Sequence, residues 1–431
     1  MMKIKRIKIK TRVNVFDLLN ILLTLVLFFY LEYLYKNFVY RYYDYTGFTY
    51  HFDGLKYLIG KILLLAGFYL VWKVPKDDLV FPVLFFVLLF YFVPNIIMYE
   101  FAGGAFVIVT GILLFIAFIR FFSAVSLRMP RSSISDTARF YLLLILALVM
   151  LFPFFLAYGF SINWKVFLLQ DIYAVRLAAR VKSTMLTGYL YSSLSKIVFP
   201  VMMIYGLLKK DYILLIVSIA GILYLFAVMA AKIVLFGMLV ALFFYYGKNY
   251  RVKIFYFLLL LCGIFIAGRI ATVFFGNLVP ESIFVRREFF LPAYLNQVYY
   301  DYFSIHPHVY WSNSVLSPFV HPVYSLDPAF LIGREYFGDV NTRANNGIIS
   351  DGYMNMGLAG VILNTLIAAL IISVINAARV NSKYLGIFFI MIITFISSPL
   401  FTGLLTHGIL LLLLLSVFLL RSEPAVGENR V

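Results

Sequence analysis

The sequence predicts an all-α, polytopic membrane protein with about twelve transmembrane helices and one large extracytoplasmic loop. Hydrophobic residues make up 64% of its 431 residues, and its mean hydropathy is +0.97. Only 13% of the residues are charged, whereas soluble domains carry about 25% charged and about 45–50% apolar residues. A water-soluble fold of this size cannot bury so much apolar surface, so the bilayer must solvate most of the chain.

A transmembrane helix needs about 20 predominantly apolar residues, and runs of about this length recur along the whole chain. They lie at residues 14–35, 57–73, 79–99, 104–123, 140–161, 190–208, 212–229, 231–246, 254–275, 353–378, 384–400 and 403–420. The last two can form one broken helix pair, because Pro399 and Gly403 predict a tight turn. The predicted organisation is therefore three segments. These are residues 1–276 with helices one to nine and an outer loop at 162–190, a large extracytoplasmic loop at 277–352, and residues 353–431 with helices ten to twelve and a cytoplasmic tail.

Lysines and arginines predict the orientation of these helices. The basic segment 1–12 precedes an apolar run that is too long for a signal peptide and lacks its small-residue cleavage site, so a retained first helix is expected. With a cytoplasmic N-terminus, most basic residues fall in cytoplasmic loops, as the positive-inside rule requires. Both termini are then cytoplasmic. The net charge of +17 is thus explained as a topology signal, and no nucleic-acid partner is predicted.

No cofactor or metal is predicted. The single cysteine, Cys262, lies inside an apolar run, which excludes an intrachain disulfide and a cysteine-based metal site. His306, His308 and His321 lie in the large loop, but their spacing matches no zinc motif. No Walker A loop or Gly-x-Gly-x-x-Gly motif is present, so nucleotide binding is not indicated.

Arginines on the predicted outer side oppose the positive-inside bias, so each needs a reason. They are Arg176 and Arg180 in the loop at 162–190, and Arg286, Arg287, Arg334 and Arg343 in the large loop. Arginine forms bidentate bonds to phosphate and stays charged at any relevant pH, so a diphosphate substrate at the outer surface is one explanation. The alternative is pairing with lipid headgroups or with loop acids such as Glu281, Glu288 and Glu335.

Two further segments of the large loop are unusual. Before the tenth helix, Ser350 or Asp351 is expected to cap a helix whose N-terminus faces outward and attracts anions. Gly352, Gly357 and Gly360 would let another helix approach closely; the alternative is an ordinary capped helix with small packing residues. The aromatic stretch 286–303 is expected to lie along the membrane interface, either as an aromatic belt or as a surface for sugar rings.

Charges inside the predicted spans are few, namely Glu32, Lys61, Lys232 and Arg269. Ion-coupled transporters usually place acidic residues near the middle of the membrane. Glu32 lies near a helix end, and no span carries a central acid beyond it. This pattern weakens a transporter interpretation.

The motifs of the large loop resemble those of the Wzy-type oligosaccharide repeat-unit polymerases, which include O-antigen and exopolysaccharide polymerases of bacteria. The resemblance is carried by Arg286-Arg-Glu-Phe-Phe-Leu-Pro-Ala, Tyr300-Asp-Tyr-Phe303, Leu331-Ile-Gly-x-x-Tyr-Phe337 and Ala344-Asn-Asn-Gly-x-x-x-Asp-Gly-Tyr-x-Asn-x-Gly-x-x-Gly360. Asp171-Ile-Tyr-x-x-Arg176 is similar to an arginine-bearing segment of the family's earlier periplasmic loop. The helix count and the large loop before the last helices are also similar.

The resemblance implies a metal-independent glycosyltransferase, with a GT-C-like fold, in the bacterial inner membrane. It would transfer a growing glycan from undecaprenyl diphosphate onto a new lipid-linked repeat unit at the outer face. The implied partners are undecaprenyl-diphosphate-linked oligosaccharides, membrane lipids and a chain-length regulator. Diphosphate binding is expected at Arg176, Arg287 and Arg343, with Arg180 and Arg334 as further candidates. The catalytic residues that remove the proton from the acceptor hydroxyl are expected among Asp351, Asp301 and His321. The alternatives are an O-antigen ligase, which shares the donor, and a lipid-linked oligosaccharide flippase.

Overall fold

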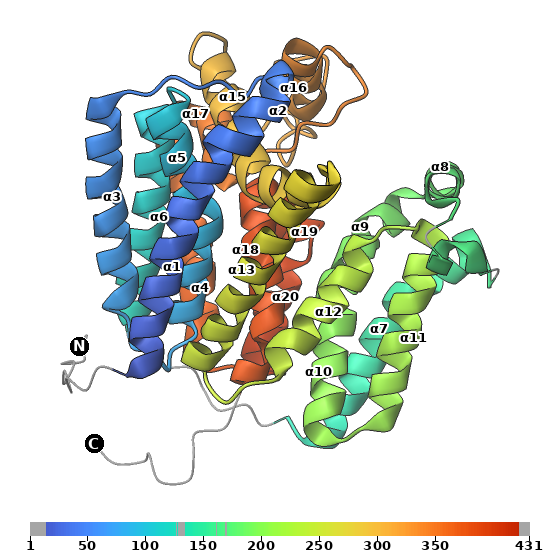
Figure 1. Ribbon diagram of the computed structural model, residues 1–431. Coiled ribbons are helices and arrows are strands. Elements are labelled where there is room, and N and C mark those ends of the chain that lie inside the picture. The colour runs from blue at the N-terminus through green and yellow to red at the C-terminus, as the bar shows by residue number, and fades with distance from the viewer. Residues whose placement is uncertain (1–13, 126, 128–133, 161, 169, 422–431) are drawn as a thin grey trace. The chain divides into compact units, whose positions relative to one another are not determined.

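The computed structural model describes residues 14–421 apart from 126, 128–133, 161 and 169, and across this part of the chain the fold is all-α (Figure 1). Two isolated β-bridges, His51 with Ala102 and Val380 with Arg421, are the only strand-like pairings among these residues. The predicted all-α class is confirmed.

Every apolar run predicted to span the membrane coincides with a helical segment. Nine of the described segments are long and apolar enough to cross a bilayer: Val15–Thr46, Gly54–Trp72, Val80–Phe101, Phe106–Ala124, Asp136–Tyr158, Met185–Lys209, Tyr212–Met229, Tyr250–Phe275 and Ile348–Ala377. The other three predicted runs hold the shorter apolar helices Ile233–Tyr245, Ser382–Ser397 and Ile409–Phe418. The chain is therefore a multi-pass membrane protein.

The helices divide between two compact units. Unit 1 comprises residues 1–126, 248–373 and 392–400, and unit 2 comprises residues 127–247, 374–391 and 401–431. The principal helices of unit 1 are α1 (Val15–Leu34), α3 (Gly54–Trp72), α4 (Val80–Phe86), α5 (Val93–Phe101), α6 (Phe106–Ala124), α13 (Tyr250–Phe275), α15 (Leu291–Phe303), α16 (Pro328–Phe337) and most of α17 (Ile348–Ala377). Those of unit 2 are α7 (Asp136–Tyr158), α8 (Ile172–Lys182), α9 (Met185–Ser193), α10 (Phe199–Lys209), α11 (Tyr212–Met229), α12 (Ile233–Tyr245) and α20 (Ile409–Phe418). Helix α18 (Leu385–Ser397) begins in unit 2 and ends in unit 1, and the short α19 (Leu400–Leu405) follows it.

The span Val80–Phe101 forms the centre of unit 1. All residues of its most apolar 18-residue stretch are buried, whereas only 22% and 33% of the residues are buried in the corresponding stretches of α3 and α13. Helices α3, α6 and α13 pack against it. A helix that is apolar on every side is stable where other helices surround it, which explains the unbroken apolar run Val80–Phe92.

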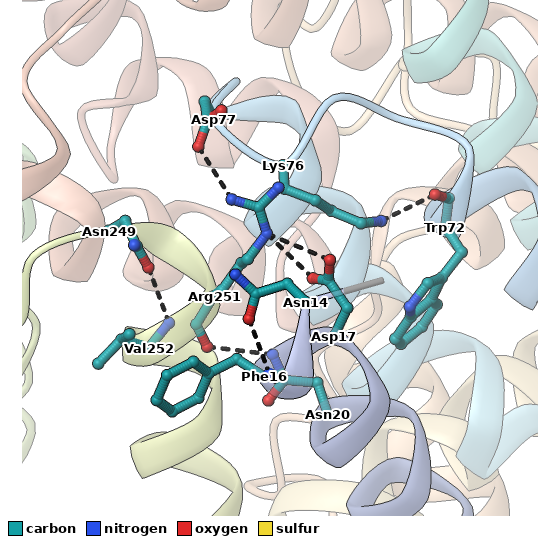
Figure 2. Close-up of polar contacts among 10 residues, drawn as sticks. All are labelled: Asn14, Phe16, Asp17, Asn20, Trp72, Lys76, Asp77, Asn249, Arg251 and Val252. Atoms are coloured by element: carbon teal, nitrogen blue, oxygen red, sulfur yellow. Dashed lines mark hydrogen bonds and ion pairs between the residues drawn. The ribbon is translucent and has the colours of Figure 1, made fainter. Parts of the chain in front are cut away.

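One end of unit 1 is held by a network of charged and polar groups at helix termini (Figure 2). The Arg251 guanidinium, in the first turn of α13, donates to Asp17 of α1 at 3.1 Å and to Asp77 of the α3–α4 connection at 3.3 Å. Asn20 of α1 donates to the Arg251 carbonyl at 3.0 Å. These bonds fix the start of α13 against the start of α1, although Arg251 and Asp17 are 234 residues apart in the sequence.

In unit 2, α10 and α11 form the closest helix pair. A side chain at Gly221 of α11 would collide with the Phe199 ring of α10. The glycine therefore allows the ring to lie against the backbone of α11, which is how small residues promote close packing in membrane helices.

Candidate functional site

The large loop forms a helical layer at one end of unit 1, where Figure 1 shows α15 and α16 together in orange. A π-helical segment, Ser282–Phe290, leads directly into α15. Phe289, Phe290 and Tyr299 are buried in this layer. The stretch 286–303 is helical, but its largest rings pack inside the protein, so the expected aromatic belt is wrong for these rings.

The segment before the tenth predicted span is a helical hairpin. Within α17 the backbone leaves helical geometry at Met356 (φ −147°) and Gly357 (φ 58°). A side chain at Gly352 would lie 2.5 Å from the Gly360 carbonyl oxygen, and Asn364 donates to the Ile348 carbonyl at 3.0 Å. Because these contacts join residues on opposite sides of the turn, the arm 348–355 runs antiparallel to the start of the long arm 358–377.

The hairpin corrects two expectations about this segment. Gly352 and Gly360 do allow a close approach, but between the two arms of one element. Asp351 is inside the first arm, where its backbone N–H donates to the Gly347 carbonyl at 2.8 Å, so the expected helix start at Ser350 or Asp351 is wrong. The outward-facing helix N-terminus that was expected to attract anions at Asp351 does not exist there.

The Asp351 carboxylate is 2% exposed and accepts three hydrogen bonds. Asn355 donates to one oxygen at 3.0 Å, while Asn364 and the backbone N–H of Leu400 donate to the other at 2.9 and 3.0 Å. Such neutral donors stabilise a buried carboxylate without an ion pair. Asp351 therefore joins the two arms of the hairpin to the start of α19.

A buried polar network continues from the hairpin into the rest of unit 1. The Ser350 hydroxyl donates to the side-chain Oδ1 of Asn296 in α15 at 2.7 Å, and the Asn296 side-chain amide donates to Oδ1 of Asn95 in α5 at 3.3 Å. The Ile349 N–H donates to the Tyr91 hydroxyl at 3.2 Å. Buried hydrogen bonds favour one arrangement of the elements that they join, so these bonds hold the hairpin and α15 on the central span.

The loop after α15 closes the tip of the hairpin. The N–H groups of Val309 and Tyr310 donate to the carbonyls of Met354 and Asn355 at 3.0 and 3.2 Å. These bonds give partners to carbonyl groups that would otherwise be free at the C-terminal end of the first arm. Tyr310 and Trp311 adopt φ values of 53° and 55°. Two consecutive non-glycine residues in this region are strained and persist only where the surroundings hold them.

His308 lies beside the hairpin tip and was not selected as a site residue from the sequence. A side chain at Gly357 would lie 3.2 Å from the Nε2 atom of His308. The His308 ring also packs against the rings of Tyr310 and Tyr353. Its Nδ1 is buried and has no hydrogen-bond partner among the described residues. No local sequence pattern distinguishes it from His306, since the hairpin that brings Gly357 to it was not predicted.

Two predicted arginines gather on one face of α16. Phe330 and Arg334 are four residues apart and therefore share a face of this helix. The Arg343 guanidinium lies over the Phe330 ring at 5.9 Å, and both arginines are exposed. Arg334 also pairs with Glu335 at 2.7 Å, whereas Arg343 has no ion-pair partner among the described residues.

Aromatic rings adjoin this face. Tyr302 of α15 stacks on the His306 ring with centroids 4.0 Å apart, and Tyr324 packs near Tyr302 at 6.3 Å. Burial raises the pKa of the Tyr302 hydroxyl, the charge of Glu335 adds to this shift, and the charge of Arg334 opposes it. We call Tyr302, His306, Tyr324, Arg334 and Arg343 the α16 surface.

Asp301 is next to Tyr302 in the sequence but belongs to a different face of α15. It is exposed and accepts a hydrogen bond from Gln297 at 2.7 Å. Neighbouring groups partly desolvate its carboxylate, which raises the pKa of Asp301 above its ordinary value although the Gln297 bond opposes this shift.

The remaining predicted residues of the large loop do not contact one another within the described part of the chain. Arg287 is exposed and forms no ion pair with a described acid, whereas the neighbouring Arg286 lies 4.3 Å over the Tyr43 ring. His321 is exposed in the connection between α15 and α16. Glu281 pairs with Arg269 of α13 at 3.6 Å and not with a loop arginine.

Arg176 and Arg180 belong to unit 2. The Arg176 Nε donates to the Ala230 carbonyl at 2.9 Å, where Ala230 ends α11 with φ 50°. A cation at a helix C-terminus is favourable because it satisfies a free carbonyl and complements the dipole. Arg176 thus has a structural partner, while Arg180 is exposed.

A buried charged cluster in unit 1 was missed from the sequence. Lys61 of α3 donates to both carboxylate oxygens of Glu100 at 2.8 and 2.9 Å and contacts Glu32. Glu100 lies one residue beyond the predicted span 79–99, yet its side chain is fully buried. Pairing lowers the cost of charges inside the membrane, and only the fold shows that these three residues meet.

Comparison with known proteins gives no family for this chain: no family model, no curated protein and no solved structure matches it. The resemblance of the large-loop motifs therefore remains a prediction. Among the described residues, no group of three or more His, Cys, Asp or Glu side chains is arranged to hold a metal ion.

Proposed function

We propose that this chain is a glycosyltransferase of the Wzy-type polymerase kind, acting on diphosphate-linked glycans at the outer face of a bacterial inner membrane. The observation that carries the proposal is the α16 surface. Two exposed arginines lie there beside aromatic rings, on a helical layer fixed to membrane-spanning helices by a buried polar network. Arginines suit a diphosphate and ring faces suit sugars.

In the proposed reaction, an acceptor sugar hydroxyl attacks the anomeric carbon of the donor glycan. A new carbon–oxygen bond forms, the bond to the diphosphate breaks, and undecaprenyl diphosphate leaves with the bonding electron pair. Charge grows on the leaving diphosphate in the transition state, where fixed donors contribute most. Arg334 and Arg343 are assigned to this charge, and no metal is needed for it.

The hydroxyl proton must pass to a base. Asp351 is buried and already accepts three hydrogen bonds, so we assign it to positioning of the hairpin. Asp301 is exposed, and a raised pKa makes a carboxylate a better proton acceptor. We therefore assign the proton to Asp301, with His321 and His308 as further candidates on the same loop.

The test is reconstitution of the purified chain with lipid-linked repeat units, followed by gel analysis of glycan length. A ladder is expected. Arg343→Ala and Arg334→Ala should each slow it by about 10²–10³-fold, as removal of one transition-state donor does elsewhere. Lysine should restore little activity, because an ammonium lacks two parallel donors.

The control is Lys248→Ala, an exposed basic residue in the α12–α13 connection, which should leave the ladder unchanged. Addition of EDTA should also leave it unchanged. Transfer only to a lipid A-core acceptor would identify a ligase. Movement of the lipid-linked unit across liposomes, without any ladder, would identify a flippase, and either result would refute the polymerase.

A further inference from the structure

Helix α8 in unit 2 packs one face against its own unit. Ile172 and Ala179 are buried on this face, and Ile172 belongs to an apolar cluster with Val166 and Phe226. Arg176, between them, donates to the end of α11. These contacts hold α8 in one rotation about its axis, so the residues on its opposite face are also defined.

The opposite face carries an apolar stripe that the described residues of unit 2 leave uncovered. Tyr173, Leu177 and Val181 are spaced four residues apart, and their side chains are 84%, 66% and 84% exposed. At 3.6 residues per turn, this stripe is centred about 150° from the packed face. Isolated exposed apolar residues are ordinary, but a continuous stripe of large ones indicates an interaction surface.

One basic residue, Arg180, borders the stripe, about 60° from its centre. Lys182 lies about 140° from the centre of the stripe, nearer the packed face. Both are exposed, and neither forms an ion pair with a described acid. The only acid between residues 162 and 184 is Asp171, which lies 3.6 Å from Lys165. The side of the stripe that Arg180 borders is therefore positively charged.

The position of α8 in the chain fixes it at the edge of the membrane. Ser183 and Thr184 alone separate it from the span Met185–Lys209, and the span of α7 ends at Tyr158 on its other side. In Figure 1, α8 is seen nearly end-on while α7, α9 and α11 of the same unit run along the page. A helix that lies across its neighbouring spans, next to their ends, lies along the membrane surface.

We propose that the outward face of α8 binds the anionic phospholipid surface of the surrounding membrane. The stripe would enter the boundary between headgroups and acyl chains, as amphipathic interfacial helices do. Arg180 would extend to lipid phosphates along the border of the stripe. Trp164, 72% exposed in the preceding turn, supports this assignment because tryptophan favours the membrane interface.

The experiment uses the full chain in lipid nanodiscs without any glycan substrate, so its result is independent of the proposed enzymatic activity. Cys262→Ala provides a cysteine-free background. A nitroxide label is attached after Leu177→Cys, with Tyr173→Cys and Val181→Cys as replicates in case one variant folds poorly. Lys182→Cys is the matched control. Collision rates with oxygen and with a water-soluble nickel chelate are then measured by electron paramagnetic resonance.

Labels on the stripe should collide with oxygen more than with the nickel chelate, and the label at Lys182 should show the reverse. Greater nickel access at the stripe would show that it faces water, and shielding from both reagents would show that protein covers it; each result would overturn the proposal. Immersion of the Leu177 label should also deepen when phosphatidylglycerol is added to phosphatidylcholine nanodiscs. Arg180→Gln should abolish this deepening, and no deepening in the native sequence would refute the role of anionic headgroups.

Discussion

Asp351 is a buried carboxylate whose three hydrogen-bond donors are all neutral. In the native protein both oxygens of Asp351 accept hydrogen bonds. Asparagine keeps only one of these oxygens, and its NH₂ group would face N–H donors, so at least one buried donor would lose its acceptor. That loss costs about 1–3 kcal/mol. Asp351→Asn should therefore lower the apparent melting temperature of the protein in detergent.

The matched control for this change is Asp301→Asn. Asp301 is exposed and its carboxylate accepts a hydrogen bond from Gln297, so water can replace this bond and the melting temperature should hardly change. Equal melting temperatures for Asp351→Asn and the native protein would contradict a structural role for Asp351. The same pair separates stability from activity, since the proposed reaction assigns the proton to Asp301.

Lys76, in the α3–α4 connection, makes the stability of the protein depend on pH. Its ammonium donates to the Trp72 carbonyl at 2.8 Å, and burial lowers the pKa of Lys76 to about 8, with Arg251 and Arg120 adding to the shift and Asp17 opposing it. The unfolded chain, with an ordinary pKa near 10.5, binds more protons between these values. Stability from this group should therefore rise as pH increases from about 8 to 10.5.

The measurement is the apparent melting temperature across this pH range for the native protein and for Lys76→Gln. The glutamine variant cannot titrate, so the part of the pH dependence due to this group should disappear. Identical slopes for the two proteins would show that Lys76 is not desolvated in the folded state.

Sequence patterns predict some of the exposed residues of the site but cannot show which polar groups already have partners. Arginine in an outer loop opposes the charge bias of membrane proteins, and this predicts a site at Arg334 and Arg343. Arg334 lies exposed on α16, and Arg343 lies exposed in the connection that follows it. Sequence patterns do not reveal whether a polar group already has a partner. That is why Asp351 and Arg176 were selected with them, although the fold gives both residues structural hydrogen bonds.

At the scale of elements, the spans could be predicted because the length of an apolar run is a local property of the sequence. The reversal at Met356 and Gly357 could not, since the run from 348 to 377 contains no proline or charge beyond Asp351 to mark it. The turn depends on contacts with distant segments, among them Val309 and Leu400. The last predicted span is likewise interrupted, between α19 and α20.

The hairpin makes a specific prediction about its glycines. A side chain at Gly352 would lie 2.5–2.7 Å from backbone atoms of Gly360 and Val361, and backbone atoms cannot move aside as a flexible side chain can. Gly352→Ala should therefore destabilise the protein by about 1–3 kcal/mol, with a lower melting temperature and a lower yield of folded protein.

Gly263 of α13 is the matched control, because nothing lies within 4 Å of the position that a side chain would occupy there. Alanine is a better helix former than glycine by about 0.5–1 kcal/mol, so Gly263→Ala should be neutral or slightly stabilising. If Gly352→Ala behaved like Gly263→Ala, the two arms of the hairpin would not be in contact.

At the scale of the whole molecule, nine of the described helical segments are long and apolar enough to cross a membrane, and the distribution of lysine and arginine predicts which side each loop occupies. The proposed function requires the α16 surface to be outside the cytoplasm, where lipid-linked glycans are polymerised in the family that the motifs resemble. The α8 inference holds on either side of the membrane. Topology is therefore a separate test of the function.

The topology test attaches an impermeant thiol reagent to intact cells that produce single-cysteine variants in the Cys262→Ala background. Ser317→Cys, in the exposed loop between α15 and α16, and Ser183→Cys, at the end of α8, should both react from outside. Lys248→Cys, exposed in the α12–α13 connection, should react only after the membrane is permeabilised. Labelling of Lys248→Cys in intact cells, with the other two silent, would invert the orientation, place the α16 surface in the cytoplasm and rule out polymerisation of exported lipid-linked glycans by that surface.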